Sequence, residues 1–589
     1  MNKLPVVNEK IEERRILPDM TVREINARYP ACRAVFARHG MGGCGGELGP
    51  DEPLEFFAAA HRVDLCCLTA ELERVAAGDL TDTDSPALAF EKRLARLYRT
   101  YIRAAILVTL TFGAAWGAHI LGVIARRQSF DAPDYAGTQA HGHAQIYGWV
   151  GLFIMGVAYF SLPKILNARL RSLLPGWTVF ALMLSGILLR AVAQPLAARP
   201  AFGWLVLGSA VLELLAVVLF VVDLGALFWR SEQPRQSFER FIQASLVALV
   251  VVAAWNLALV VPLWRGESTV IADPANSRFL YLAVFGFIVN MILGYSLRLL
   301  PIFLGLRPVR PSWVLPALIL FNAGVVARLF GATLASGALT FLGMAVYVAA
   351  LRIFEPSAGE VKSRGVDAIF PWFVRLAYFW FAAAVTMVVA GDLYLFLTGT
   401  APAHIYTGSW RHAVTVGFIT TLMVGLGYRL LPLFVGVDLW RPGWMRASFW
   451  LLAVGNTTRV IFELATATGE RWTYLVMGAS GVLELTALML FGFGIWKTLG
   501  RRQQVLVSDA QISAKTHVRW LLDNFPAARQ ELIRAGLTHL QTAKFVPYFV
   551  TLEQAAKIHG VAVEPIVSHL QATLRPPRAA EHEQRRKAS

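Results

Sequence analysis

Long apolar stretches alternate with short polar connections along most of the chain, from about residue 100 to residue 500. A transmembrane helix needs roughly 20 mostly apolar residues. The pattern therefore predicts twelve spans, near 101–124, 142–167, 173–196, 202–229, 240–264, 278–304, 313–331, 335–354, 371–398, 408–435, 446–466 and 473–497. We expect an all-α membrane protein with about twelve transmembrane helices.

The membrane region carries an internal repeat. The segment FGFIVNMILGYSLRLLPIFLG (285–305) matches VGFITTLMVGLGYRLLPLFVG (416–436), and a shift back by 138 residues reaches HGHAQIYGWVGLFIMGVAYFSLPKI (141–165). One register aligns Gly156, Gly294 and Gly425; Pro163, Pro301 and Pro432; Arg190, Arg328 and Arg459; and His143, Tyr281 and His412. Repetition at a fixed period indicates repeated structural units. We therefore expect three pseudo-symmetric four-helix units.

The two polar ends of the chain also repeat each other. Residues 22–41 align with 518–537, and residues 53–72 align with 551–570. Their apolar residues recur with helical spacing. The sequence therefore predicts small helical domains at 15–80 and 510–575, on either side of a membrane domain at 99–498. The first copy resembles a family of small domains of unknown function through Tyr29, Pro30, His39, Gly40, Cys44, Leu54 and Glu55.

All four cysteines lie in the first end domain: Cys32, Cys44, Cys66 and Cys67. The second copy has Ala528 opposite Cys32 and contains no cysteine. The role that both copies share is therefore packing or the binding of a partner. We expect such a partner to be a cytoplasmic protein. A metal or redox role for Cys44, or for the adjacent Cys66 and Cys67, stays open beside the alternative of buried apolar cysteines.

The charge distribution predicts the topology. The chain is 56% hydrophobic and carries a net charge of +16. Lys and Arg are more frequent in the connections after the even-numbered spans, so the positive-inside rule predicts that both termini are cytoplasmic. We expect a multi-pass protein of the bacterial inner membrane whose basic residues contact membrane lipid rather than nucleic acid. In the reducing cytoplasm we expect no structural disulfide.

Histidines and arginines fall in one layer of this topology. His143 precedes Pro163 by 20 residues, which corresponds to about 30 Å of helix, so the two lie at opposite membrane faces. The predicted outer half contains His119, His141, His143, His404 and His412, with Arg190, Arg328 and Arg459. Imidazole ligates haem iron, and guanidinium groups pair with propionates. This favours a b-type haem bound by His143 and His412. The alternatives are histidines that join helices by hydrogen bonds, and arginines that pack between repeats or reach lipid head groups.

His141 and His143 point about 200° apart on a regular helix. They therefore serve two neighbouring centres, or His141 lies in a frayed helix end. His119 and His404 are candidates for a second centre, which could hold haem or copper. Glu213 and Glu484 both lie in the sequence VLEL. Each could carry protons or form hydrogen bonds between helices.

These residues resemble the NnrS family. The first motif is matched by His141, His143, Gly148, Gly156 and Pro163, and the second by His412, Ala413, Gly417 and Arg429. The resemblance implies a haem- and copper-containing membrane protein linked to nitric oxide and nitrosative stress. A more distant resemblance to subunit I of haem-copper oxidases and nitric oxide reductases implies a haem held between histidines of spans 2 and 10. Spans 6 and 7 depart from the oxidase pattern because they contain no histidine.

Three functions are consistent with the sequence. The first is a haem-binding protein of nitric oxide or respiratory redox metabolism, with His143 and His412 as ligands. The second is an oxidoreductase, namely a divergent nitric oxide reductase or quinol oxidase, which takes electrons from quinol or another donor and protons through Glu213 or Glu484. The third is a transporter or membrane scaffold without a cofactor.

Overall fold

The computed structural model describes residues 16–76, 86–231, 234–356, 367–501 and 512–573, apart from scattered positions within the first and the last of these ranges. The chain separates into two compact units. One consists of Met1–Ser85 and Arg502–Ser589, and the other is the membrane unit, Pro86–Arg501. The described residues are helical, except for turns, loops and one isolated β-bridge between Thr21 and Pro53.

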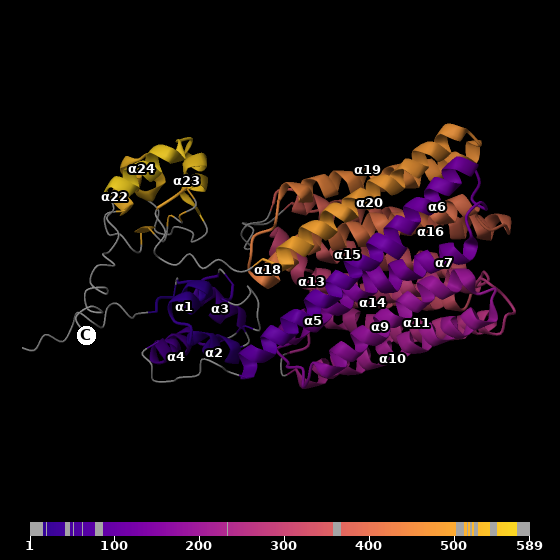
Figure 1. Cartoon of the computed structure of the whole chain (residues 1–589), viewed down its shortest axis with the longest axis horizontal. Coiled ribbons are helices and arrows are strands. Elements are labelled where there is room, and N and C mark those ends of the chain that lie inside the picture. The colour runs from indigo at the N-terminus through magenta and orange to yellow at the C-terminus, as the bar shows by residue number, and fades with distance from the viewer. Residues whose placement is uncertain are drawn as a thin grey trace, which may run out of the picture. The chain divides into compact units, whose positions relative to one another are not determined.

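Long helices that run alongside one another form the membrane unit (Figure 1). In chain order they are α5 (Pro86–Val108), η2 (Thr109–Gly113) and α6 (Ala114–Arg127); α7 (Tyr135–His143), η3 (Ala144–Gly151) and α8 (Leu152–Ile165); α9 (Leu174–Ala193) with η4 (Gln194–Leu196); α10 (Pro200–Arg230); α11 (Ser237–Trp264); α12 (Ala275–Tyr281), η5 (Leu282–Val289) and α13 (Asn290–Leu304); α14 (Pro311–Leu329); α15 (Thr333–Leu351); α16 (Phe370–Thr398); α17 (His404–His412), η6 (Ala413–Thr420) and α18 (Thr421–Val435); α19 (Gly443–Ala465) with η7 (Thr466–Thr468); and α20 (Arg471–Leu499). We number these twelve groups as spans 1 to 12.

The predicted fold class is confirmed, with one difference in the number of spans. Among the described residues, eleven helices are long and apolar enough to cross a membrane. The exception is span 11, because α19 has 23 residues but carries charged and polar side chains. Asn456, Arg459 and Glu463 are each almost fully buried within the protein. The polar side chains of α19 thus face neighbouring helices, while its apolar residues Trp450, Val454 and Ile461 are exposed.

Helix contacts follow the predicted threefold repeat. Within each unit the third and fourth helices pack together, as α9 with α10, α14 with α15 and α19 with α20. Each fourth helix also packs on the first helix of the next unit: α10 on α11, α15 on α16 and, closing the circle, α20 on α6. The three equivalent units therefore close into a ring.

The second helix of each unit lies at the centre of the ring. In their most apolar windows, spans 2, 6 and 10 are 89%, 89% and 83% buried within the protein, against 28% to 50% for the other eight helices that qualify as spans. Hydrogen bonds join the central helices directly, from Trp149 to Thr420 and between Ser161 and Tyr295. Polar groups on these helices consequently meet protein rather than lipid.

Each central helix widens to π-helical geometry at the same point of the repeat. The segments η3, η5 and η6 begin directly after His143, Tyr281 and His412. Such π segments are rare and frequently occur at functional sites. The apolar pattern of these helices predicts regular α-helix and gives no sign of the π segments.

The opposite ends of the central helices are equivalent too. Pro163, Pro301 and Pro432 lie inside α8, α13 and α18, a few residues before these helices end. The fourth residue after each proline has a positive φ in all three units: Asn167 at 48°, Gly305 at 59° and Gly436 at 71°. Proline limits helix extension and a left-handed residue ends it. We call this end of the bundle the proline face and the other the histidine face.

The helical ends of the chain share a hydrogen-bond pattern. The first contains α1 (Val22–Arg28), α2 (Cys32–Arg38), α3 (Leu54–His61) and α4 (Leu65–Ala76). The described part of the second contains α22 (Ala528–Arg534), η8 (Thr538–Gln541), α23 (Leu552–His559) and α24 (Val563–Thr573). The bond from the amide of Leu54 to the carbonyl of Met20 recurs from Leu552 to Thr516. Each copy has its own apolar core.

The repeated glycines allow the first and second helices of each unit to approach closely. A Cβ atom at Gly156, Gly294 or Gly425 would lie 2.6 to 2.7 Å from Tyr101, Ile242 or Phe373, respectively. Such distances are far below van der Waals contact, and small residues at helix interfaces permit close packing in membranes.

We therefore expect Gly294→Ala to destabilise the protein by about 1–3 kcal/mol, the usual cost of overpacking. The matched control is Gly225→Ala in α10, since a Cβ at Gly225 meets nothing within 4 Å. Thermal unfolding of the purified protein in detergent measures both. Equal melting temperatures for the two variants would contradict the close helix contact.

Candidate cofactor site

Polar side chains gather in one layer near the histidine face. In each unit the head residue of the central helix, His143, Tyr281 or His412, lies at the same repeat position. On the fourth helix the equivalent positions hold Glu213, Thr340 and Glu484. The third helix of each unit shows that these positions are equivalent. Cβ atoms added at its glycines, Gly186, Gly324 and Gly455, would contact Glu213, Thr340 and Glu484, respectively. The three units thus carry three versions of one polar arrangement.

In the first unit the head residue is held by a buried carboxylate. His143 Nε2 lies 3.1 Å from Glu213 Oε2, and the side-chain amide of Asn256 donates to the same oxygen at 2.9 Å. All three side chains are buried. His143 also stacks on Tyr147, with ring centroids 4.6 Å apart. Because its Nε2 is occupied by Glu213, His143 acts here as a link between spans 2 and 4.

In the second unit the same layer is closed by protein contacts. The hydroxyl groups of Tyr281 and Thr340 are 3.0 Å apart. Arg328 makes two parallel hydrogen bonds to Asp392 and donates from Nε to Ser336, while its guanidinium group lies over the Tyr281 ring. Bidentate pairing of this kind satisfies both charges. Spans 5 to 8 contain no histidine, and Arg328 is already paired with Asp392.

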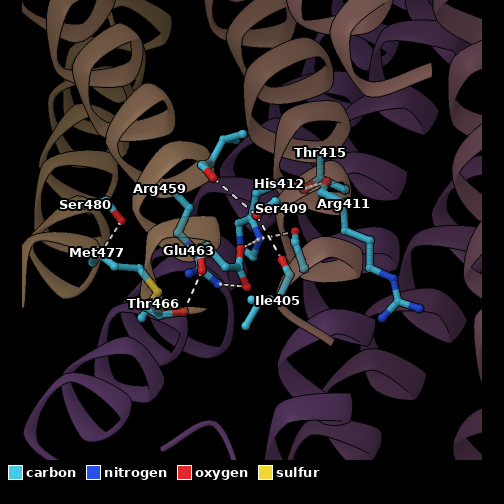
Figure 2. Close-up of polar contacts among 12 residues, drawn as sticks. Ile405, Ser409, Arg411, His412, Thr415, Arg459, Glu463, Thr466, Met477 and Ser480 are labelled. Carbon is cyan, nitrogen blue, oxygen red and sulfur yellow. Dashed lines mark hydrogen bonds and ion pairs between the residues drawn. The ribbon is translucent and has the colours of Figure 1, made fainter. Parts of the chain in front are cut away.

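In the third unit the head residue is only partly enclosed. Nδ1 of His412 lies 3.0 Å from the carbonyl oxygen of Gly408 and 3.8 Å from Glu463 Oε2 (Figure 2). Arg459 donates from Nη2 to Glu463 at 3.2 Å. The His412 side chain keeps 31% of its surface exposed although its helix is central. The surrounding helices therefore cover this imidazole only in part.

His141 has the same local arrangement as His412. Its Nδ1 lies 3.0 Å from the carbonyl oxygen of Gly113 in span 1, and its ring packs against Gly117, where a Cβ would be 2.7 Å away. A carbonyl oxygen can only accept, so Nδ1 carries the proton in both histidines. The Nε2 atoms of His141 and His412 then present lone pairs, and neither has a hydrogen-bond partner among the described residues.

Their positions on the helix answer the question raised by the HGH motif. His141 belongs to helix α7 rather than to a frayed end. It points toward span 1, whereas His143 points toward span 4. His141 and His412 are close enough to interact electrostatically. The pairing of His143 with His412 stays an untested prediction. Glu213 occupies Nε2 of His143 and leaves its buried Nδ1 without a partner among the described residues, whereas in His141 and His412 the free nitrogen is Nε2.

The three repeated arginines have different surroundings. Arg328 is neutralised by Asp392, so helix packing rather than propionate binding accounts for it. Arg190 is 1% exposed and donates from Nε to Gln194, while Nη1 has no partner among the described residues. Arg459 has two such atoms, Nε and Nη1. Only the first and third units therefore keep donor atoms for a bound anion.

The other candidate residues lie apart from this pairing. His119 is exposed on α6, and His404 is exposed at the start of α17 with its ring 5.7 Å from that of Phe130. Glu213 forms hydrogen bonds between helices, which is one of the two roles that the sequence suggested for it. Glu484 is close enough to Arg459 and Glu463 to interact with both, and its Oε1 has no partner in the described part of the chain.

A copper centre with several protein ligands has no counterpart in this layer. Among the described residues there is no group of three or more His, Cys, Asp or Glu side chains that could hold a metal ion. A haem needs only one or two axial ligands from the protein. The donor set of His141 and His412 thus fits haem, and the described residues do not fit the copper that the resemblance implied.

The cysteines of the first end domain fall into two kinds. Cys32 is fully buried, as is Ala528 at the equivalent position, so both serve packing. Burial raises the pKa of the Cys32 thiol to about 12. Cys66 and Cys67 are exposed, so the expectation of buried apolar cysteines was wrong for this pair. Cys44 lies outside the described residues.

Comparisons with known proteins identify no family. No family model and no curated protein matches the chain. Among solved structures it is similar to a haem-copper terminal oxidase determined by cryo-electron microscopy, with 12% identity over 82% of this chain and 99% of the other, and a TM-score of 0.45. A likeness at this level does not identify a cofactor, substrate or ligand here. The NnrS resemblance stays a prediction.

The link between His143 and Glu213 gives a stability prediction. Glu213→Ala leaves His143 and Asn256 without their shared acceptor, so we expect a loss of about 3–5 kcal/mol, as for removal of one partner of a buried pair. Glu213→Gln keeps an acceptor oxygen and should cost much less. Thermal unfolding in detergent measures both variants. The control is Glu470→Ala at an exposed site, and a Glu213→Ala variant as stable as this control would contradict the link.

The high pKa of Cys32 gives a reactivity prediction. With a pKa of about 12, roughly one Cys32 thiol in 10⁴ is ionised at pH 8, and only the thiolate reacts. Maleimide should therefore label a variant that keeps only Cys32 slowly until the protein is unfolded in detergent. A variant that keeps only the exposed Cys66 should be labelled in the native state. Similar native labelling rates would show that Cys32 is accessible.

Proposed function

We propose that the chain is a haem-binding membrane protein in which the iron is held between His141 of span 2 and His412 of span 10. The observation that carries this is the shared geometry of the two imidazoles. In each, Nδ1–H is bound to a backbone carbonyl 3.0 Å away and Nε2 is left for a ligand. Histidines that bind metals commonly donate their other ring N–H in this way, which fixes the tautomer and the ring orientation.

The surroundings support a cofactor with carboxylate groups. Arg459 lies beside the His412 site, with its side chain 5% exposed and its Nε and Nη1 unpartnered among the described residues. Burial of a guanidinium group is costly unless its charge is paired, and Glu463 occupies only one of its donors. Arg459 would therefore bind a propionate.

A bound haem would supply one-electron redox chemistry or a site for nitric oxide. The chain's own residues orient the ligands: the carbonyl groups of Gly113 and Gly408 hold the imidazoles, and the central helices exclude lipid. We assign the protein to nitric oxide or respiratory redox metabolism on the NnrS resemblance. We further propose the bacterial inner membrane and cytoplasmic termini, from the charge distribution.

The observations do not favour the oxidase-like alternative. A haem-copper centre of that kind requires ligands beyond the haem histidines, and among the described residues there is no group of three or more suitable side chains. In the second unit, Tyr281, Thr340 and the pair of Arg328 with Asp392 satisfy one another. We therefore propose haem alone.

Haem content and spectrum of purified variants test the assignment. The native protein should show a Soret band and the visible bands of low-spin haem with two histidine ligands. His141→Ala and His412→Ala should each remove the low-spin bands, because each deletes an axial ligand. His143→Gln, which keeps a hydrogen-bonding group toward Glu213, should retain them.

Two results would count against the proposal. Native protein without any Soret absorption would exclude haem. Loss of the low-spin bands in His143→Gln but not in His141→Ala would restore His143 as the ligand. Melting temperatures of the same samples show whether a variant lost haem because it unfolded.

A further inference from the structure

A second polar space lies beside span 2. It is a cavity of about 200 Å³ near the histidine face, lined by residues of α7, η3, α9, α11, α12 and α17 and of their connections. Its lining includes Arg190, Arg411, His143, Gln194 and Asn256. None of the described residues that line it is Asp or Glu. The cavity is therefore rich in hydrogen-bond donors and positive in charge.

Arg190 is built into this cavity with a free donor. It is 1% exposed, and its Nε donates to Gln194 at 2.6 Å. Gln194 donates in turn to Gln139, which also accepts from the amide of Ile271 and donates to its carbonyl. This chain of hydrogen bonds fixes the guanidinium group. Its Nη1 is buried and has no partner among the described residues.

Arg411 brings a second guanidinium group to the same space from α17. Its Nη2 donates to Ser277, and its Nε is buried without a partner in the described part of the chain. Figure 2 shows Arg411 directed away from the group formed by His412, Arg459 and Glu463. His141, one ligand of the proposed haem, also lines the cavity, so the two sites are neighbours. The argument for anion binding rests on the two arginines and not on haem.

The positive charge of the two arginines is not balanced at contact distance. Neither forms an ion pair with a described carboxylate; Glu213 acts on Arg190, and Asp273 and Glu463 act on Arg411, only at longer range. Glu213 is already bonded to His143 and Asn256, and Glu463 to Arg459. A buried cation without a partner is costly, so a bound anion would stabilise this arrangement.

We propose that this cavity binds a small oxoanion or carboxylate between Arg190 and Arg411. Guanidinium groups bind oxyanions through parallel, charge-assisted hydrogen bonds. Because a water molecule takes up about 30 Å³, the space admits an anion of the size of nitrite, nitrate or formate with a few waters. The amide groups of Gln194 and Asn256 provide further polar contacts at its wall.

Titration of the purified full-length protein in detergent with sodium nitrite tests this, in a buffer that contains no other oxoanion or carboxylate. We expect saturable binding at one site per chain, seen by calorimetry and as a rise in melting temperature. Arg190→Gln and Arg411→Gln should each weaken binding at least about tenfold, the effect of losing a charge-assisted hydrogen bond. Arg265→Gln, at an exposed arginine of a connecting loop, should leave it unchanged.

The outcomes separate a free anion from a haem propionate, the other source of a carboxylate. The proposal requires that the nitrite site that depends on Arg190 and Arg411 has the same affinity in the native protein and in His412→Ala, whose altered residue is not among those that line the cavity. Nitrite bound to haem iron is recognised separately, by a shift of the Soret band. Binding only in the haem-free protein would assign the cavity to a propionate and overturn the proposal. No saturable binding, or equal affinity in both arginine variants and the native protein, would also overturn it. If Arg190→Gln does not fold, Arg411→Gln alone decides.

Discussion

The arrangement of this protein depends on one constraint: the three central helices have almost no contact with lipid. Spans 2, 6 and 10 are at least 83% buried in the protein, so any polar group on them needs a protein or ligand partner. Close approach at Gly156, Gly294 and Gly425 holds the helices of each unit together. The ring contacts from α20 to α6 complete the enclosure. Polar side chains therefore had to gather where partners exist, in one layer near the histidine face.

The repeat makes it possible to distinguish structural from functional polarity. All three units carry a polar head residue and an arginine in equivalent positions. In the second unit these groups satisfy one another, through Tyr281 with Thr340 and Arg328 with Asp392. In the first and third units the same positions leave atoms without partners among the described residues, such as Nη1 of Arg190 and Arg459. The second unit thus serves as an internal control, and the remaining donors are the basis for the ligand sites proposed above.

The fold could be predicted from the sequence because it depends on features that recur along the chain. Apolar length predicted the spans, and the aligned glycines and prolines predicted three units, since close packing and helix ends require these residue types wherever they recur. The span that fell short, α19, did so because its polar face is covered by neighbours, which hydropathy along the chain cannot show.

The details of the site depend on properties that the sequence does not express directly. The choice between His141 and His143 turns on which neighbouring helix each ring faces, and this is set by the order of helices in the ring. Asp392, the partner of Arg328, lies 64 residues further along the chain on a helix of the next unit, so no local pattern could reveal it. The recurrence of VLEL did identify Glu213 and Glu484, although not that Glu213 would bind His143, the predicted haem ligand.

Helix α7 carries the two histidines that belong to different sites. His141 faces span 1 and the proposed haem, whereas His143 faces span 4, and both border the cavity that contains Arg190. The π segment that follows directly changes the rotation of the helix at this point, so the positions of both imidazoles relative to the rest of span 2 are set by the same turn. The carbonyl group of Gly113 and the carboxylate of Glu213 therefore give the two histidines of the HGH motif different neighbours on different helices. The motif thus combines one imidazole that joins spans 2 and 4 with one whose Nε2 has no partner among the described residues.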